Sequence, residues 1–374
     1  MMPREWVRWF PYFAMLILLM LGFIVPYGEA GAGRTAAQFL SLGGGTRAAA
    51  MGEAYSTSSG DVMAILWNPG GLAGVKEIQT AISYNNAGAR FGEAGEGIYY
   101  GIFAAAFPAG DLGVFGLGLQ LNGQGVIDVT IDSPEVVRQE SLGTNWALTL
   151  SYADEFLPNL RAGASGRIIR QKLGPESATA YAADIGLQYK ISPLMLGLSV
   201  QNWGTRIQFK DANQSDPLPR TMRMGVGFQI LNSKYHRARI TGDLVAFIDK
   251  FKEDEDEMVF AIQQRKEKMM QAGETPPSDD ELRRQIEEER GIGIYAFKPS
   301  NMQKSLGFEY WFADILALRV GYKDDPYVQT SSFNDKLNYG FGIRFKNYQF
   351  DYASIPGGGP NNVRLNTFDL LFRF

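Results

Sequence analysis

The chain has 374 residues, of which 45% are hydrophobic and 13% aromatic, and its formal net charge is −4. This composition excludes a disordered chain and a pure coiled coil, and it leaves the globular and membrane classes. It also excludes a nucleic-acid surface, which needs clustered positive charge. A helical membrane protein is excluded as well, because no uncharged apolar run of about 18 residues follows the N-terminal region.

The N-terminus has the layout of a signal peptide. Two arginines precede an apolar run from Phe10 to Val25, and small residues follow it up to Ala32. We expect residues 1–30 to be the signal peptide, with cleavage after Ala30 or Ala32; an uncleaved anchor helix is the alternative. The chain has no cysteine, so the exported protein must be stabilised by burial or backbone pairing rather than by disulfides.

Residues 31–75 are rich in glycine and alanine and show no sustained strand alternation. A barrel of the size predicted below would leak unless its lumen were filled, so we expect this segment to lie inside it as a plug or hatch. Its sequence Asn68-Pro69-Gly70-Gly71 predicts a turn, because proline fixes φ, glycine accepts positive φ and asparagine can bond its own backbone.

Several stretches of this segment resemble the N-terminal signature of the PorV/PorQ-type branch of the FadL-like outer-membrane barrels. They are Phe39-Leu40, Gly45-Thr46-Arg47-Ala48-Ala49-Ala50-Met51-Gly52, Ala54-Tyr55, Asp61 and Trp67-Asn68-Pro69-Gly70-Gly71-Leu72. The resemblance implies a fourteen-stranded barrel with an N-terminal hatch, and it covers the hatch closely but the strands only by layout. The chain departs from the family where it has Asn-Pro-Gly-Gly in place of the usual Asn-Pro-Ala-Gly. The candidate ligand-binding or gating residues of the hatch are Arg47, Asp61, Asn68, Pro69 and Gly70.

From residue 76 onward, with one exception, large apolar residues alternate with small or polar ones, which is the period of a strand with two different faces. The clearest case is the C-terminal strand, where Phe368, Leu370, Phe372 and Phe374 share one face. The opposite faces are rich in Gly, Arg and Asp, as expected for a polar lumen, so we interpret the apolar faces as lipid-facing. The fourteen predicted strands are 76–84, 98–107, 112–122, 135–152, 159–172, 178–190, 193–202, 219–230, 236–248, 303–312, 315–323, 338–345, 347–354 and 365–374. The fold class is therefore all-β, a transmembrane antiparallel β-barrel over residues 76–374.

The connections between these strands alternate between short and long, with only residues 173–177 brief among the long ones. Outer-membrane barrels have short periplasmic turns and longer extracellular loops. This parity places both termini in the periplasm and the long loops outside the cell. Many of the 43 glycines fall at inward positions, where they either leave space in the lumen or relieve strain at barrel curvature.

The exception to the strand pattern is residues 252–290, which hold 13 Asp/Glu and 7 Lys/Arg. Acidic residues precede basic ones in its first half, as a helix dipole favours, and Gly273 can end that helix. Its second half opens with Ser278-Asp279-Asp280-Glu281, a capping-box spacing, and stops at Gly291. We expect an extracellular helical hairpin that covers the pore mouth or contacts a partner; a solvated insertion without a role is the alternative. The family resemblance does not predict this insertion.

The sequence offers little for catalysis. His236 is the only histidine and there is no cysteine, which excludes a central histidine triad, thiol chemistry and the usual zinc sites. We therefore predict no enzyme activity, no metal and no cofactor. The predicted polar lumen residues are Arg167, Asp184, Glu309, Arg319 and Arg344, with Asp351, Asp369, Arg161, Arg223 and Arg373 also inward. Opposed lumen charges more often brace a plug or set selectivity than catalyse.

Two functions remain open. The resemblance to FadL-like channels implies uptake of hydrophobic small molecules with lateral release through the barrel wall. The resemblance to PorV/PorQ implies instead a type IX secretion component that binds or anchors protein cargo at the cell surface. A diffusion porin without a dedicated ligand is a third hypothesis, which the hatch makes less favoured. The expected partners are outer-membrane lipid, the small molecule or cargo, and the barrel assembly machinery, for which Phe374 is the predicted assembly signal.

Overall fold

The computed structural model describes residues 35–86, 97–130, 136–209, 215–248, 255–326, 332–357 and 364–374. The expected signal peptide, residues 1–30, lies outside these ranges. The described residues fall into two compact units, one made of Gly33–Asp249 with Gln303–Phe374 and one that contains Lys250–Met302.

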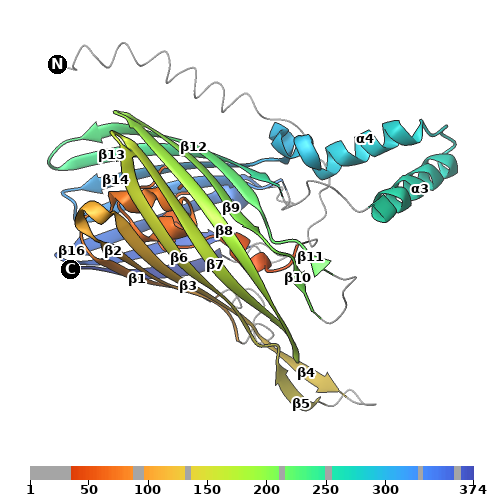
Figure 1. The fold of residues 1–374 in the computed structure, drawn as a ribbon, viewed down its shortest axis with the longest axis horizontal. Helices are drawn as coiled ribbons and strands as arrows, with labels where there is room; N and C mark the ends of the chain where they lie inside the picture. The colour runs from red at the N-terminus through yellow and green to blue at the C-terminus, as the bar shows by residue number, and fades with distance from the viewer. Residues whose placement is uncertain are drawn as a thin grey trace. The chain divides into compact units, whose positions relative to one another are not determined.

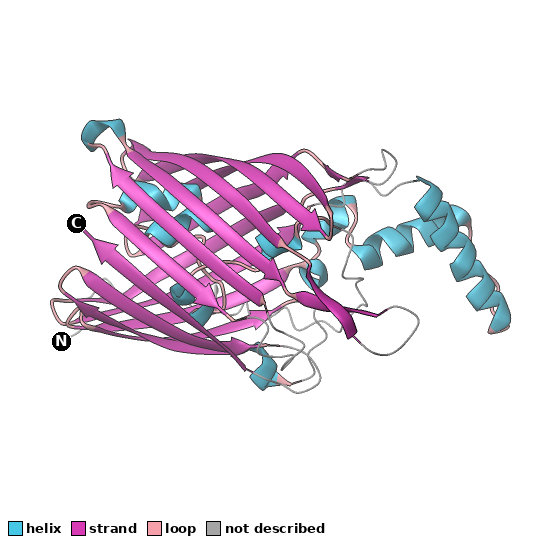
Figure 2. Cartoon of the chain, turned by 90° about the horizontal axis from the view of Figure 1, so that it is seen from below, coloured by secondary structure: helices cyan, strands magenta, loops and turns pink. Residues whose placement is uncertain are grey.

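The first unit is a closed antiparallel β-barrel of fourteen strands (Figures 1 and 2). In chain order the strands are β1 (Gln79–Asn85), β2 (Ile98–Pro108), β3 (Val114–Gln124), β6 (Thr144–Leu157), β7 (Leu160–Leu173), β8 (Glu176–Ile191), β9 (Leu194–Gly204), β12 (Thr221–Asn232), β13 (His236–Phe247), β14 (Gln303–Phe312), β15 (Leu316–Asp324), β16 (Leu337–Phe345), β17 (Tyr348–Pro356) and β18 (Arg364–Arg373). The barrel closes where β1 pairs with β2 on one side and with β18 on the other. The predicted fold class and strand number are confirmed.

The two faces of the wall differ as the alternation predicts. On β18, Phe368 and Leu370 point outward and are 43% and 49% exposed, whereas Thr367 and Asp369 point inward and are both 4% exposed. The same exposed rows recur on neighbouring strands. Large apolar side chains gathered over a whole outer face need a non-aqueous surrounding, which a membrane supplies.

The connections alternate in length around the barrel, as predicted. Two ends of the barrel can therefore be named, a short-turn end and a long-loop end. The short-turn end has the connections at 109–113, 158–159, 192–193, 233–235, 313–315 and 346–347. The long-loop end has those at 86–97, 125–143, 205–220, 248–302, 325–336 and 357–363, with a two-residue turn at 174–175 among them. The first of the short ones holds η5 (Gly110–Leu112), and β10 (Ile207–Gln208), β11 (Ser215–Asp216) and η8 (Phe333–Lys336) lie in the long ones.

One predicted strand is wrong. Residues 135–152 form not one strand but β5 (Val136–Ser141) and β6, and β5 pairs with β4 (Val126–Thr130) in a separate two-stranded sheet. Gly125 and Gly143 both have positive φ where the chain leaves and re-enters the barrel, a conformation that glycine adopts without strain. The predicted strand ran across this break because only Leu142 and Gly143 separate β5 from the alternating pattern of β6.

Residues 35–75, here called the N-terminal segment, lie inside the barrel (Figure 1, red to orange). The segment forms four short helices, η1 (Gln38–Ser41), α2 (Thr46–Ala50), η2 (Val62–Leu66) and η3 (Pro69–Gly74). Asp61 and Asn68 begin η2 and η3, where their side chains accept hydrogen bonds from the backbone N–H groups of Met63 and Gly70. These caps allow two helical turns that are too short to be stable alone.

The inward glycines are the positions where the N-terminal segment touches the wall. A Cβ at Gly163 would lie 2.5 Å from the backbone of Pro69, and one at Gly197 would lie 2.6 Å from the carbonyl oxygen of Ser56. Of the predicted inward glycines, all but Gly342 face this segment: Gly116, Gly118, Gly186, Gly197, Gly225, Gly227 and Gly340. The glycines do leave space, as one of the two interpretations held, and side chains and backbone of residues 50–72 occupy that space.

The second unit consists of α3 (Glu255–Gln271) and α4 (Asp279–Arg290), followed by η6 (Gly293–Phe297) and η7 (Pro299–Asn301). Met258 and Ile262 of α3 pack against Leu282 and Ile286 of α4. Ser278 caps α4, its side chain accepting from the N–H of Glu281, and the helix ends at a left-handed glycine. No helix in the described ranges is both long and apolar enough to span a membrane.

Candidate functional site

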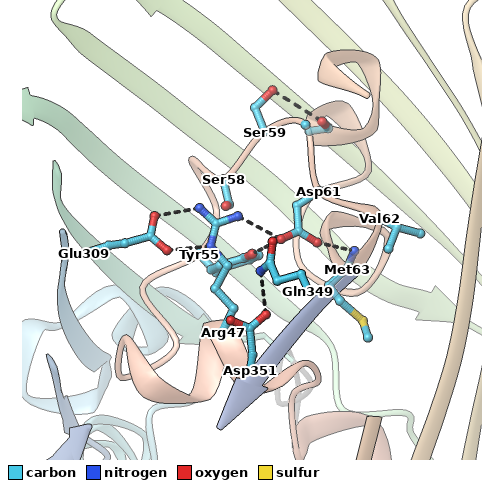
Figure 3. Close-up of polar contacts among 12 residues, drawn as sticks. Arg47, Tyr55, Ser58, Ser59, Asp61, Val62, Met63, Glu309, Gln349 and Asp351 are labelled. Atoms are coloured by element: carbon cyan, nitrogen blue, oxygen red, sulfur yellow. Dashed lines mark hydrogen bonds and ion pairs between the residues drawn. The ribbon is translucent and has the colours of Figure 1, made fainter. Parts of the chain in front are cut away.

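The site is a chain of buried charges that joins the N-terminal segment to the barrel wall. It begins at α2, whose first residue, Thr46, donates through its backbone N–H and its hydroxyl to the Asp369 carboxylate, both at 2.6 Å. This anchor fixes the start of α2 against β18. The next residue, Arg47, then reaches across the lumen to β14 (Figure 3).

Arg47 is held on two sides. Its Nε and Nη2 donate to the two carboxylate oxygens of Glu309 at 2.7 and 2.6 Å, and its Nη1 lies 2.9 Å from Asp61 Oδ2 (Figure 3). A bidentate guanidinium–carboxylate pair is the stronger and more directional form of this contact. The predicted candidates Arg47 and Asp61 are therefore in direct contact, and Glu309 joins them.

Glu309 also pairs with two arginines of the wall. Arg239 of β13 and Arg319 of β15 are its direct cross-strand neighbours, and their Nε atoms lie 3.0 and 2.8 Å from its carboxylate. Arg319 donates onward to Asp351 of β17 at 2.6 Å. Buried charges are tolerated only when they are paired and hydrogen-bonded. The Glu309 carboxylate meets that condition, because it contacts three guanidiniums. Two of these are also paired with other carboxylates, Arg47 with Asp61 and Arg319 with Asp351.

Asp61 is the acidic end of this chain within the N-terminal segment. It accepts hydrogen bonds from the hydroxyl of Tyr55 at 2.7 Å and from the N–H of Met63 at 2.9 Å, besides the contact with Arg47. Burial disfavours its charged form, but the Arg47 guanidinium and these hydrogen bonds outweigh burial and hold the pKa of Asp61 below its usual value. Asp61 is therefore ionised at neutral pH and locks η2 to α2.

The charge chain extends to the short-turn end of the barrel. Gln349 donates to Asp351 at 2.6 Å, and its amide oxygen accepts from both Arg344, at 2.9 Å, and Arg373, at 2.9 Å. The Arg344 guanidinium also lies over the Trp311 ring, 4.6 Å from its centroid. The predicted lumen residue Arg344 thus faces the lumen, but it touches no carboxylate among the described residues.

The predicted turn at Asn68-Pro69-Gly70 lies against β7, β8 and β9. The Asn68 amide donates to the backbone carbonyl oxygens of Ser56 and Leu187, both at 2.9 Å, so one side chain joins two parts of the segment to the wall. Pro69 and Gly70 pass close to Gly163 and Gly186. These three residues hold the segment in place; whether they bind or gate a ligand stays a prediction.

Arg167 and Asp184 form a second cluster. Their charged groups are 2.7 Å apart, both side chains are almost fully buried, and Arg167 also donates to Asn202 at 2.9 Å. The backbone N–H of Asn202 donates to Asp184 at 2.7 Å. The two predicted lumen residues therefore brace β7, β8 and β9 against one another, and neither contacts Arg47.

Several lumen residues were not among the sequence candidates. Arg239 joins the charge chain, and Asp243 accepts from the backbone N–H groups of Tyr55 and Ser56 at 3.0 and 2.8 Å. Their signal was present in the sequence, since residues 237–243 of β13 place Arg, Arg, Thr and Asp at alternate positions. His236 lies at the start of β13 at the short-turn end, as predicted, and its Nδ1 is 2.7 Å from the Tyr310 hydroxyl.

Near the long-loop end, apolar side chains of the N-terminal segment are buried against the wall beside polar ones such as Arg223 and Gln201. Phe39, Met63, Ile65 and Trp67 of the N-terminal segment pack in one buried cluster with side chains of the inner wall and of the 205–220 loop: Tyr100, Ile102, Ile169, Ile207 and Leu218. We call this cluster the luminal apolar core. The Tyr100 hydroxyl donates to the carbonyl oxygen of Gly43 at 2.7 Å, which fixes the segment at its rim.

These features define a class, an outward-apolar β-barrel whose lumen is filled by its own N-terminal segment. Within the described ranges, no three His, Cys, Asp or Glu side chains gather closely enough to hold a metal ion. No protein-family profile and no curated protein matches the chain.

Among solved structures, the chain is similar to the toluene transporter TbuX of Ralstonia pickettii, with 13% identity and a TM-score of 0.49 over 89% of this chain and 98% of that one. It is also similar to the toluene transporter TodX of Pseudomonas putida, with 13% identity and a TM-score of 0.48 over 88% and 96%. A FadL homologue of Pseudomonas aeruginosa gives 12% and 0.43 over 88% and 96%. At these identities and TM-scores, the similarities say nothing about what this chain binds, and the PorV/PorQ assignment gains no support from them.

Proposed function

We propose that this chain is an outer-membrane channel for hydrophobic small molecules, and that its N-terminal segment is the gate. The observation that carries the proposal is the luminal apolar core. A channel for ions or sugars needs a continuous polar, hydrated path, whereas here Phe39, Trp67 and Ile102 are buried together inside the barrel. Such a lumen favours an apolar solute over a hydrated one.

The orientation follows from the connections. Outer-membrane barrels keep short turns in the periplasm, so we place the short-turn end and the C-terminus there and the long loops outside the cell. The luminal apolar core then faces the outside, and the charge chain from Arg47 to Gln349 faces the periplasm. A hydrophobic molecule that enters from outside meets the apolar side first.

Passage requires the N-terminal segment to move. Its contacts with the wall include apolar packing near the long loops, hydrogen bonds such as those of Asn68, and the directional Arg47–Glu309 ion pair. An apolar ligand can replace the packing but not the ion pair. We therefore expect ligand entry to displace the segment around Trp67 while α2 remains anchored.

We further propose that release is lateral, through the barrel wall. An apolar molecule on the axial route would have to pass between buried, paired charges such as Glu309 and Arg319, which costs free energy whenever a pair is separated. The outer face of the wall is apolar, and the surrounding lipid is a better solvent for such a molecule. The secretion alternative depends on the PorV/PorQ resemblance, and no contact in the described ranges adds to it.

A disulfide between the segment and the wall tests the gate. A Cβ at Gly227 would lie 3.3 Å from the Cβ of Thr57, close to disulfide geometry, and the chain has no cysteine of its own. Cells that express Thr57→Cys/Gly227→Cys should take up radiolabelled toluene or oleate when the pair is reduced and should lose that uptake when it is oxidised. The control is Ser151→Cys/Ser165→Cys, a cross-strand wall pair whose oxygens are 2.7 Å apart and which leaves the segment free. Equal uptake by oxidised and reduced Thr57→Cys/Gly227→Cys would refute the gate.

The same cells report the route of release. A fluorescent fatty acid released through the wall reaches the outer-membrane lipid before it reaches a binding protein in the periplasm. Simultaneous arrival at both would argue for axial release and against the lateral route, without bearing on the gate.

A further inference from the structure

The outer face of the barrel carries a groove of about 370 Å³ between β8 and β9. Its lining is mostly apolar, from Ala183, Ile185, Leu187, Leu198, Val200 and Trp203, with Ser199 as the polar member. Ile185 and Trp203 are 62% and 56% exposed, so the groove opens outward, away from the lumen.

A break in the strand pairing creates the groove. The β8–β9 register shifts between the pair Ala183–Trp203 and the pair Ile185–Val200, so two residues of β9 lie opposite Asp184 alone. Asn202, one of these two, has a φ of 59°, in the left-handed region that few non-glycine residues adopt. A bulge of this kind bends the strand and locally separates it from its neighbour.

The wall is closed behind the groove. The buried Arg167–Asp184 pair fills the inner side of the bulge, and Ser199 and Gln201 donate to the carbonyl oxygens of Trp67 and Leu66 at 2.9 and 2.7 Å. A molecule in the groove is therefore separated from the lumen by a layer of buried polar side chains. This geometry favours an occupant that comes from the membrane over a solute that leaves the lumen.

A cation lies at the long-loop end of the groove. The Arg220 guanidinium is 5.3 Å from the centroid of the Trp203 ring, and its Nη2 donates to the carbonyl oxygen of Gly204 at 2.8 Å. Within the described part of the chain, Arg220 has no carboxylate partner, and its Nε has no hydrogen-bond acceptor. Tryptophan is typical of the membrane–water interface, where lipid phosphates also lie.

We propose that this groove binds one lipid that carries a phosphate, with an acyl chain along β8 and β9 and the phosphate on Arg220. Charge complementarity decides the occupant, because a guanidinium that has no carboxylate partner among the described residues, beside an exposed apolar groove, matches an anionic amphiphile and gains nothing from a neutral one. The proposal requires the barrel to lie in a membrane but is independent of its transport activity.

Native mass spectrometry of the purified full-length barrel in detergent tests the proposal. Phosphatidylglycerol should be retained as a single bound lipid, and diacylglycerol with the same chains should be lost. Arg220→Gln should weaken phosphatidylglycerol retention roughly fivefold, since one arginine near a lipid phosphate contributes about that factor. Ala183→Phe, which fills the groove, should abolish retention.

Arg206→Gln is the matched control. Arg206 is an exposed loop arginine that donates to Ser215, and its substitution removes the same charge as Arg220→Gln. An equal loss with Arg206→Gln, or equal retention of diacylglycerol and phosphatidylglycerol by the wild type, would overturn the proposal. A difference in gel migration between heated and unheated samples verifies that each variant is a folded barrel. Toluene or oleate uptake is measured on the same variants and should be unchanged, which separates this test from that of the gate.

Discussion

At the residue scale, Arg47 connects the N-terminal segment to the wall by pairing with two carboxylates, Asp61 and Glu309. The two carboxylates differ in how many other cations they contact. Without Arg47, Glu309 would still be paired with Arg239 and Arg319. Asp61 would keep only the hydrogen bonds from Tyr55 and Met63 and would have no cation in contact. Removal of Arg47 therefore leaves the Asp61 carboxylate without a cation and should destabilise η2, which Asp61 caps.

We predict that Arg47→Ala lowers the free energy that holds α2 and η2 in place by about 3 kcal/mol, the order expected when one partner of a buried ion pair is removed. Hydrogen exchange of the amides of residues 46–66 measures this loss, and ion conductance in planar bilayers should rise with it. Arg237→Ala is the control, since Arg237 pairs with Asp314 at the short-turn end, where the two side chains are 39% and 53% exposed, and its loss should cost less than about 1 kcal/mol. Equal protection in both variants would contradict the importance given to this contact.

At the element scale, β7 shows how the wall accommodates the segment. Gly163 and Gly166 lie in the same strand but on opposite faces. A Cβ at Gly163 would meet the backbone of Pro69 at 2.5 Å, whereas a Cβ at Gly166 would meet nothing within 4 Å. The first glycine is therefore required by the close approach of two backbones, and the second is not.

Gly163→Ala should thus destabilise the barrel by about 1–3 kcal/mol, because the turn at Pro69 has to shift to make room. Gly166→Ala should be neutral or should stabilise by up to about 1 kcal/mol, since glycine is unfavourable in a strand interior. The midpoint of urea unfolding in lipid bilayers measures both. If the two alanine variants unfold at the same concentration, the segment does not press on the wall at this position.

At the scale of the whole molecule, closure depends on β18, the C-terminal strand. It pairs with β1 and β17, and beyond its last residue the N–H of Phe374 still donates to the carbonyl oxygen of Ile78 at 2.9 Å. The Phe374 ring itself is 70% exposed and contributes little packing. The expected role of Phe374 as an assembly signal therefore predicts an effect on insertion rather than on stability.

We predict that deletion of Phe374 lowers the yield of barrel in the outer membrane several-fold, whereas Phe374→Ala, which keeps the N–H that donates to Ile78, leaves the unfolding midpoint of the refolded protein unchanged. Phe345→Ala is the control, because this ring is 68% exposed at the same end of the barrel and should not affect yield. A normal outer-membrane yield without Phe374 would remove the assembly role. A shifted midpoint would mean that the residue acts through stability instead.

The period, the number and the order of the strands could be predicted from the amino-acid sequence. Alternation of apolar and small residues is a local property, so β14 and the C-terminal strand could be located to within a residue or two. The parity of the connections followed from the same local pattern. It also predicted that Glu309 and Arg319 point inward, because side-chain direction in a strand needs only the period of two.

The contacts between inward side chains could not be predicted and depend on the folded barrel. Arg47 and Glu309 are 262 residues apart in sequence, and their contact depends on strand register and on the path of the N-terminal segment through the lumen. The β4–β5 hairpin and the β8–β9 bulge were likewise missed, because a bulge or a departure from the barrel shifts register without changing the alternation on either side. Period is encoded residue by residue, whereas register and luminal packing are set by the closure of the whole barrel around its own N-terminus.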